Sequence, residues 1–159
     1  FDRISMLAGN PTATMQVFIS GMGYKDFSMT PVLLQGNTVP AANTGGLFAY
    51  LQESSWSGSS TDSIGLIEFK VDFSNPANSG IIGRASLVTS AYSSVVCGSP
   101  RSQCIPQPGS AVLLEALDQR VMNQPIYRNF GSYEGIVFTN ALEKGSNISG
   151  LRWYELLKT

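Results

Sequence analysis

The sequence predicts an all-β protein built of antiparallel strands, and three observations support this fold class. Segments 119–128, 134–142 and 149–156 have the length and composition of β-strands, and two short connections with Gly or Ser join them. Apolar runs bounded by Gly, Pro, Asn and Ser recur along the whole chain. No window of eleven or more residues keeps an amphipathic helical pattern together with capping residues. We therefore expect antiparallel meanders, which are the units of β-propellers and β-sandwiches.

The expected strands, in chain order, are 13–20, 31–34, 47–52, 64–73, 81–88, 111–115, 119–127, 135–141 and 150–156. Segment 64–73 has the clearest pattern, because charged residues from Glu68 to Asp72 alternate with apolar residues from Ile67 to Phe73. Such alternation is typical of a half-buried antiparallel strand. Segment 75–80 contains Asn, Pro and Gly and predicts the turn that follows. Segments 1–8 and 111–119 could form a short helical turn.

The strand count favours an incomplete β-propeller. Propeller repeats of four strands occupy about 40–50 residues, so the 159 residues correspond to roughly three blades. We expect residues 1–159 to form a single β domain that is a segment of a larger propeller continuing beyond both ends. Its open sheet edges would then pair with polypeptide outside this chain. A two-sheet β-sandwich, complete as it stands, is the alternative.

The composition favours a globular protein from outside the cytoplasm. Apolar residues make up 43% of the chain and charged residues only 13%. The net charge of −1 and the absence of basic clusters exclude a phosphate-binding stripe, so we expect no nucleic-acid partner. The chain has no histidine, which removes the commonest general base and metal ligand. We expect no metal and no cofactor.

The two cysteines also favour a secreted, extracellular protein. Cys97 and Cys104 lie seven positions apart in a loop rich in Pro, Ser and Gly, and a local disulfide is preferred over two free thiols. Asn147 begins an Asn-Ile-Ser acceptor for glycosylation, which predicts a glycoprotein if the source is a eukaryote. No apolar run is long enough for a membrane span. The chain begins at Phe1, and we expect it to be a piece of a longer protein.

Six motifs along the chain resemble, in order, segments of a known protein family. They lie at Phe1–Gly9, Phe69–Ser79, Cys104–Gly109, Leu117–Met122, Tyr127–Gly131 and Leu151–Leu156, and they span nearly the whole sequence. The family comprises large secreted, mainly bacterial proteins of poorly characterised function whose repeated sheets look like a propeller. The resemblance implies further blades on both sides of this chain.

The resemblance implies no catalytic residue for this chain. Where many relatives carry histidines after the Tyr-Arg-Asn-Phe motif, this chain has Ser132, Tyr133 and Glu134, followed by Asn140. Any role of those histidines is therefore absent.

Three carboxylates are the weak candidates for catalysis. Asp118, Glu134 and Glu155 could supply the acid and base of a glycosidase, which needs two carboxyl groups about 5–10 Å apart. Nearby Arg120 and Arg152 offer a structural explanation instead, through salt bridges and turn hydrogen bonds. We favour the structural explanation.

Four residues are candidates for binding. Arg120, Arg128 and Arg152 could clamp an acidic sugar or carboxylate, although arginines among aromatic residues commonly stack on rings and bind carbonyl groups. Trp56, in a Ser-rich loop, could stack on a sugar ring or pack against the sheet.

The sequence therefore predicts a non-catalytic extracellular scaffold or binding module. It would contribute blades to a larger secreted protein or assembly, and its partners would be the remaining blades of the same or a companion chain. A glycan or an extracellular protein is a further expected partner. The alternative is a segment of a secreted carbohydrate-active hydrolase.

Overall fold

The computed structural model describes residues 1–18, 23, 26, 28–42, 44–98, 103–116, 120–146 and 148–159. Strands hold 45% of the chain and helices 10%, which confirms the all-β class. The elements in chain order are α1 (Arg3–Leu7), β1 (Thr30–Pro31), β2 (Leu33–Gln35), β3 (Gly46–Gln52), α2 (Ser54–Ser57), β4 (Ser63–Lys70), the 3-10 turn η1 (Pro76–Asn78), β5 (Gly80–Val88), the 3-10 turn η2 (Val96–Gly98), β6 (Gln103–Gln107), β7 (Ser110–Glu115), β8 (Ile126–Asn129), β9 (Glu134–Glu143) and β10 (Ser149–Lys158).

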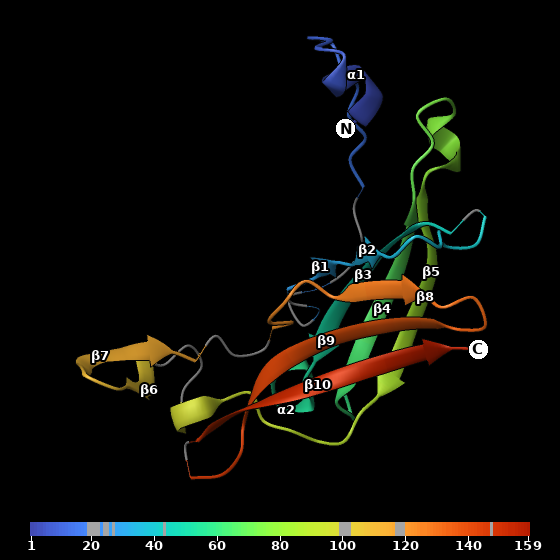
Figure 1. The fold of residues 1–159 in the computed structure, drawn as a ribbon. Helices are drawn as coiled ribbons and strands as arrows, with labels where there is room; N and C mark the ends of the chain where they lie inside the picture. The colour runs from blue at the N-terminus through green and yellow to red at the C-terminus, as the bar shows by residue number, and fades with distance from the viewer. Residues whose placement is uncertain are drawn as a thin grey trace.

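The strands form two four-stranded sheets and one hairpin (Figure 1). Sheet A has the strand order β1-β3-β4-β5, sheet B has the order β10-β9-β8-β2, and β6 pairs with β7 in a two-stranded sheet. The pairing is antiparallel except between β2 and β8, which run parallel. The meander predicted at the C-terminal end is confirmed, since β8, β9 and β10 are consecutive antiparallel neighbours.

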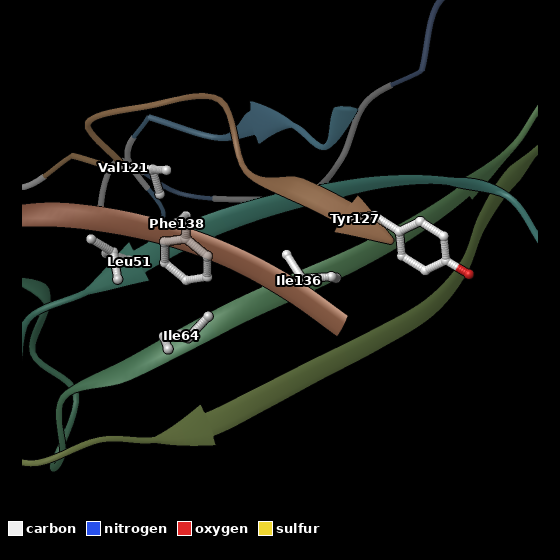
Figure 2. Close-up of a cluster of buried hydrophobic side chains, with 6 residues drawn as sticks. All are labelled: Leu51, Ile64, Val121, Tyr127, Ile136 and Phe138. Carbon is white, nitrogen blue, oxygen red and sulfur yellow. The ribbon is translucent and has the colours of Figure 1, made fainter. Parts of the chain in front are cut away.

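Sheets A and B face each other across one shared hydrophobic core. Figure 2 shows Leu51 and Ile64 of sheet A opposite Ile136 and Phe138 of sheet B, with Val121 and Tyr127 beside them. This two-layer arrangement matches the sandwich alternative directly, and two neighbouring blades of a propeller would also face each other in this way. The blade count therefore stays a prediction. Where a third four-stranded meander was expected, the described residues contain only the β6–β7 hairpin.

Strand β4 is buried more completely than its alternating pattern predicted. Ile64 and Leu66 pack into the shared core, whereas Ile67, which points to the opposite face, is also buried. Phe18 covers that opposite face, with its ring centroid 4.6 Å from that of Phe69. The expectation of a half-buried strand is therefore wrong for β4, because Phe18 covers the apolar face while the face with Leu66 and Glu68, which the alternation leaves open, turns toward sheet B.

Several element boundaries also differ from the prediction. Residues 13–18 are not in a strand, and residues 120–125 precede β8 instead of belonging to it. Strand β6 and helix α2 form within segments that were expected to be loops. The predicted disulfide between Cys97 and Cys104 is present, and it connects η2 to β6 at the base of the hairpin. Both elements that the prediction missed lie in Ser- or Pro-rich segments without apolar alternation.

Candidate functional site

The most prominent surface feature is the outer face of sheet B, the face turned away from the shared core. Its large apolar side chains are exposed, most of all Leu151 at 75%, Trp153 at 67% and Leu157 at 58%. We call this surface the outer B face and define it by Ile126, Phe130, Val137, Leu151, Trp153 and Leu157. Scattered exposed apolar residues are normal, but a contiguous group on one sheet face marks an interaction surface.

The register of sheet B explains why these side chains share one face. Successive residues of a strand point to opposite faces, so Phe138 and Leu156 enter the core while Val137 and Leu157 point outward. Phe130 extends this surface after β8 and lies 3.6 Å from the position that a Cβ at Gly135 would occupy. A larger residue there would crowd this contact.

An aromatic group forms one end of the outer B face. The rings of Phe130 and Tyr133 stack with centroids 4.6 Å apart, and the guanidinium carbon of Arg128 lies 5.2 Å from the Phe130 ring. Arg128 therefore uses its charge in a cation–π contact on this face.

A cleft of about 400 Å³ opens between the two sheets beside β5 and β10. Leu47, Leu66, Tyr127 and Leu156 give it apolar walls. The charged groups that line it are Glu68, Arg84, Glu134 and Lys158. A cleft of this size and lining can hold an apolar side chain or a small apolar molecule.

The acidic groups of this cleft are engaged in structural contacts. Lys158 Nζ lies 3.1 Å from Glu134 Oε2, and Glu68 Oε1 accepts a hydrogen bond from the backbone of Gly45 at 2.8 Å. Glu155 is not on this side of the sheet, because it is separated from Lys158 by an odd number of positions along β10. Glu134 and Glu155 therefore do not form a carboxylate pair on one face.

Two buried carboxylates that the sequence did not single out hold the segment between β5 and η2. Glu53 is 1% exposed, accepts hydrogen bonds from the backbone N–H of Ser94 at 3.0 Å and from the Ser94 hydroxyl, and accepts a third from the Ser55 hydroxyl at 2.6 Å. A buried charge requires such partners to offset the loss of hydration. Glu53 is therefore a structural anchor.

Asp62 has the same structural role one strand away. It is 2% exposed, and its two oxygens accept the backbone N–H groups of Ser54 at 2.7 Å and Tyr92 at 2.6 Å. Burial acts to raise the pKa of Asp62, but the hydrogen bonds from Ser54 and Tyr92 and the charge of Arg152 together bring the pKa below its usual value. The sequence contains a signal for Glu53 and Asp62, because they flank a Ser-rich segment, and acidic side chains at such positions commonly accept hydrogen bonds from turn backbone.

Arg152 is also occupied within the chain. It donates from Nη1 to the carbonyl of Ser90 at 2.9 Å, and its guanidinium carbon lies 5.4 Å from the centroid of the Tyr92 ring. Burial raises the pKa of Tyr92 well above its ordinary value, and the neighbouring Tyr154 adds to the rise. Arg128 and Arg152 occupy opposite faces of sheet B and do not converge on one ligand.

The remaining predicted site residues are placed as follows. Trp56 is half-buried in α2 and is not an open platform. Arg120 is half-buried next to the core residue Val121. Asp118, the third candidate carboxylate, and Asn147, the predicted glycosylation acceptor, lie outside the described residues.

Within the described part of the chain, no group of three or more His, Cys, Asp or Glu side chains is arranged to hold a metal ion. Among the same residues, no helix has the length and apolar character needed to cross a membrane.

Comparisons with known proteins add no relative to this picture. No protein-family model matches the chain, and neither a curated protein nor a solved structure is significantly similar to it. The fold and the outer B face therefore provide the basis for a functional proposal.

Proposed function

We propose that this chain is a non-catalytic binding module, or scaffold segment, of a larger extracellular protein or assembly, and that the outer B face is its docking surface. One observation carries the proposal. Large apolar side chains stand exposed on the outer face of β9 and β10, while the inner face of the same strands is packed into a core. Exposing such groups is costly, at about 25 cal/mol for each Å² of apolar surface.

The expected partner is another β-sheet layer. Strands with apolar side chains on both faces are typical of sheets covered on both sides. Val137 and Trp153 on the outer face are matched by Phe138 and Tyr154 on the inner face, so β9 and β10 have this character. A further sheet of the same protein or of a companion chain would cover the outer B face as sheet A covers the inner one.

The disulfide supports an extracellular location. Cys97 and Cys104 are bonded, and such bonds persist mainly in oxidising compartments. The resemblance of the sequence to large secreted, propeller-like proteins agrees with this proposal, because further blades would supply the covering sheet.

The hydrolase alternative has less support. Glu134 is ion-paired with Lys158, and Glu155 lies on the opposite face of the same sheet. A glycosidase needs two carboxyl groups converging on one substrate bond.

Oxidative footprinting tests the proposal on the intact secreted protein and on the recombinant chain of residues 1–159. We expect Phe130 and Trp153 to be oxidised in the recombinant chain and protected in the native material. Met6 and Met15, which are exposed in the N-terminal segment, serve as internal controls for equal radical dose. Equal oxidation of Phe130 and Trp153 in both samples would contradict a covered outer B face.

A further inference from the structure

The cleft between the two sheets contains a buried tyrosine hydroxyl without a hydrogen-bond partner. Tyr127 is 2% exposed and lines this cleft of about 400 Å³. Its hydroxyl makes no hydrogen bond within the described part of the chain. Figure 2 shows Tyr127 at one end of the core cluster, with the hydroxyl oxygen pointing away from the other five side chains. Burying a polar group without a partner is costly, so an unpartnered hydroxyl in a cleft wall indicates a ligand-binding position.

The carboxylate of Glu134 lies near this hydroxyl and lines the same cleft. Burial raises the pKa of Tyr127, and the charge of Glu134 raises it further, so the hydroxyl is protonated at neutral pH. The two groups form no hydrogen bond of regular length and angle. A tyrosine oxygen can accept as well as donate, so a ligand with several N–H groups can donate to both residues.

Glu68 contributes a second carboxylate to the cleft from sheet A. Its Oε1 accepts the backbone N–H of Gly45 at 2.8 Å, and no hydrogen bond to its Oε2 is formed among the described residues. A Cβ at Gly83 would lie 3.3 Å from Oε2, so the glycine keeps the space beside this oxygen open. The cleft therefore has acceptor atoms on both sheets.

The side chains that face the cleft leave one negative charge uncompensated. Glu68 and Glu134 supply two carboxylates, and Lys158 supplies one ammonium group, which is paired with Glu134. Arg84 also lines the cleft, but it lies opposite Ile67 in the ladder, so its side chain points to the outer face of sheet A. A carboxylate next to apolar walls favours a cationic ligand, because the ligand charge offsets the lost hydration.

We propose that this cleft binds a small amphipathic amine, with a primary ammonium group held by the two carboxylates and the tyrosine hydroxyl. The three N–H groups of the ammonium donate to Glu68 Oε2, to Glu134 and to the Tyr127 oxygen. The apolar body of the ligand packs against Leu66 and Leu156 within the volume of about 400 Å³. This inference concerns the space between the sheets and does not depend on docking at the outer B face.

Titrations followed by NMR test the class of ligand. The probes 4-phenylbutylamine, 4-phenylbutan-1-ol and 4-phenylbutanoate share one apolar body and differ in the head group. We expect the amine to bind with a Kd on the order of 0.1–1 mM, which is ordinary for a molecule of this size. The alcohol should bind at least about tenfold more weakly, and the carboxylate should not bind.

Two further readouts belong to the same titrations. Methylamine, which has the charge without the apolar body, should not bind. The chemical-shift changes caused by 4-phenylbutylamine should centre on Leu66, Tyr127 and Ile136, which line the cleft. The inference is overturned if the amine does not bind, if its shifts lie elsewhere, or if any of the other probes binds as tightly.

Substitutions with opposite expected effects test the charges of the site. Glu68→Gln keeps the acceptor for Gly45 but removes the charge, and it should weaken amine binding about tenfold while leaving alcohol binding unchanged. Lys158→Gln leaves Glu134 without its counterion and should strengthen amine binding. Glu155→Gln removes the same charge from the other face of sheet B and is the matched control, with no expected effect. Equal effects of Glu68→Gln and Glu155→Gln, or no gain in Lys158→Gln, overturn the inference.

Tyr127→Phe separates a ligand contact from a structural role. Because the hydroxyl has no partner in the described chain, its removal should leave the melting temperature unchanged or raise it. The same variant should weaken binding of 4-phenylbutylamine about threefold or more, because the ammonium loses one acceptor. A lower melting temperature would assign the hydroxyl a structural partner, and unchanged binding would show that the amine does not reach it. Either result overturns the inference.

Discussion

Gly65→Ala probes the close packing of sheet A on its outer face, where the ring of Tyr50 lies over Gly65 of the neighbouring strand. A Cβ at position 65 would lie 1.9 Å from Cζ and 2.2 Å from Cε1 of Tyr50. Carbon atoms in contact are normally about 3.5–4.0 Å apart, so the ring would have to withdraw by roughly 1.5 Å. Tyr50 is only 9% exposed, which leaves the ring little room to move without losing its contacts.

The expected effect is the difference between two terms. Overpacking a buried site costs about 1–3 kcal/mol. Replacing a strand glycine by alanine recovers about 0.5–1 kcal/mol, because glycine loses more backbone entropy on folding. We expect Gly65→Ala to lower the free energy of unfolding by about 1–2 kcal/mol, and the melting temperature to fall by about 2–4 °C for each kcal/mol.

Urea unfolding of a double-mutant cycle measures this coupling. In a Tyr50→Ala background the ring is absent, so Gly65→Ala should become stabilising by about 0.5 kcal/mol or more. Gly46→Ala on β3 is the matched control, because the nearest atom to its Cβ would be at 3.7 Å and no clash arises. The same destabilisation by Gly65→Ala with and without the ring of Tyr50 would refute the reasoning.

Three further predictions concern the buried carboxylates and the disulfide. Glu53→Ala should lower the free energy of unfolding by about 3 kcal/mol or more, because the N–H and hydroxyl of Ser94 lose a buried acceptor. Glu53→Gln keeps an acceptor oxygen and should lower it less. Equal effects of the two substitutions in urea unfolding would contradict this prediction. The pKa of Asp62 is lower in the folded state than in the unfolded chain. The ionised carboxylate therefore stabilises the fold above the unfolded pKa of about 3.9, and this contribution to the free energy of unfolding is lost as the pH falls through the folded pKa. Asp62→Asn should therefore be less stable than wild type at neutral pH and should lose less stability on acidification. Urea unfolding of both proteins across a pH series measures this difference. The same pH dependence in both proteins would contradict a lowered pKa of Asp62. Replacing Cys97 and Cys104 by Ser should cost about 2–3 kcal/mol in the chain-entropy model, and limited proteolysis should then cleave first around the β6–β7 hairpin; unchanged cleavage would argue against the disulfide as its clamp.

Local sequence patterns were sufficient to predict the strands of the C-terminal meander and the pair of strands β4 and β5. β9 and β10 contain long runs of β-branched, aromatic and leucine residues, and the Asn-Pro segment before Gly80 forms the turn η1 between β4 and β5. The disulfide was also predictable from the sequence. Cys97 and Cys104 are close in sequence, and the chain has no further cysteine or histidine that would complete a metal site with them.

The candidate site could be predicted only in part. Trp153 and Glu155 are visible in the sequence, but their orientation depends on which face of sheet B meets sheet A. Glu53 was not recognised, because its partner Ser94 is 41 residues away and the contact forms only when the segment after β5 crosses the molecule. Trp56 was predicted in a loop, where it could stack on a sugar ring or pack against the sheet, and it lies half-buried in α2.

The all-β class, the positions of the main strands along the chain and the local disulfide follow from the sequence, because they depend on side-chain period, turn residues and short-range closure. Three features arise only in the folded chain: β2 pairs in parallel with β8, both faces of β4 are covered, and the apolar row of β10 points outward. Alternation specifies two faces of a strand but not which face is buried. Only packing against a second layer makes that choice.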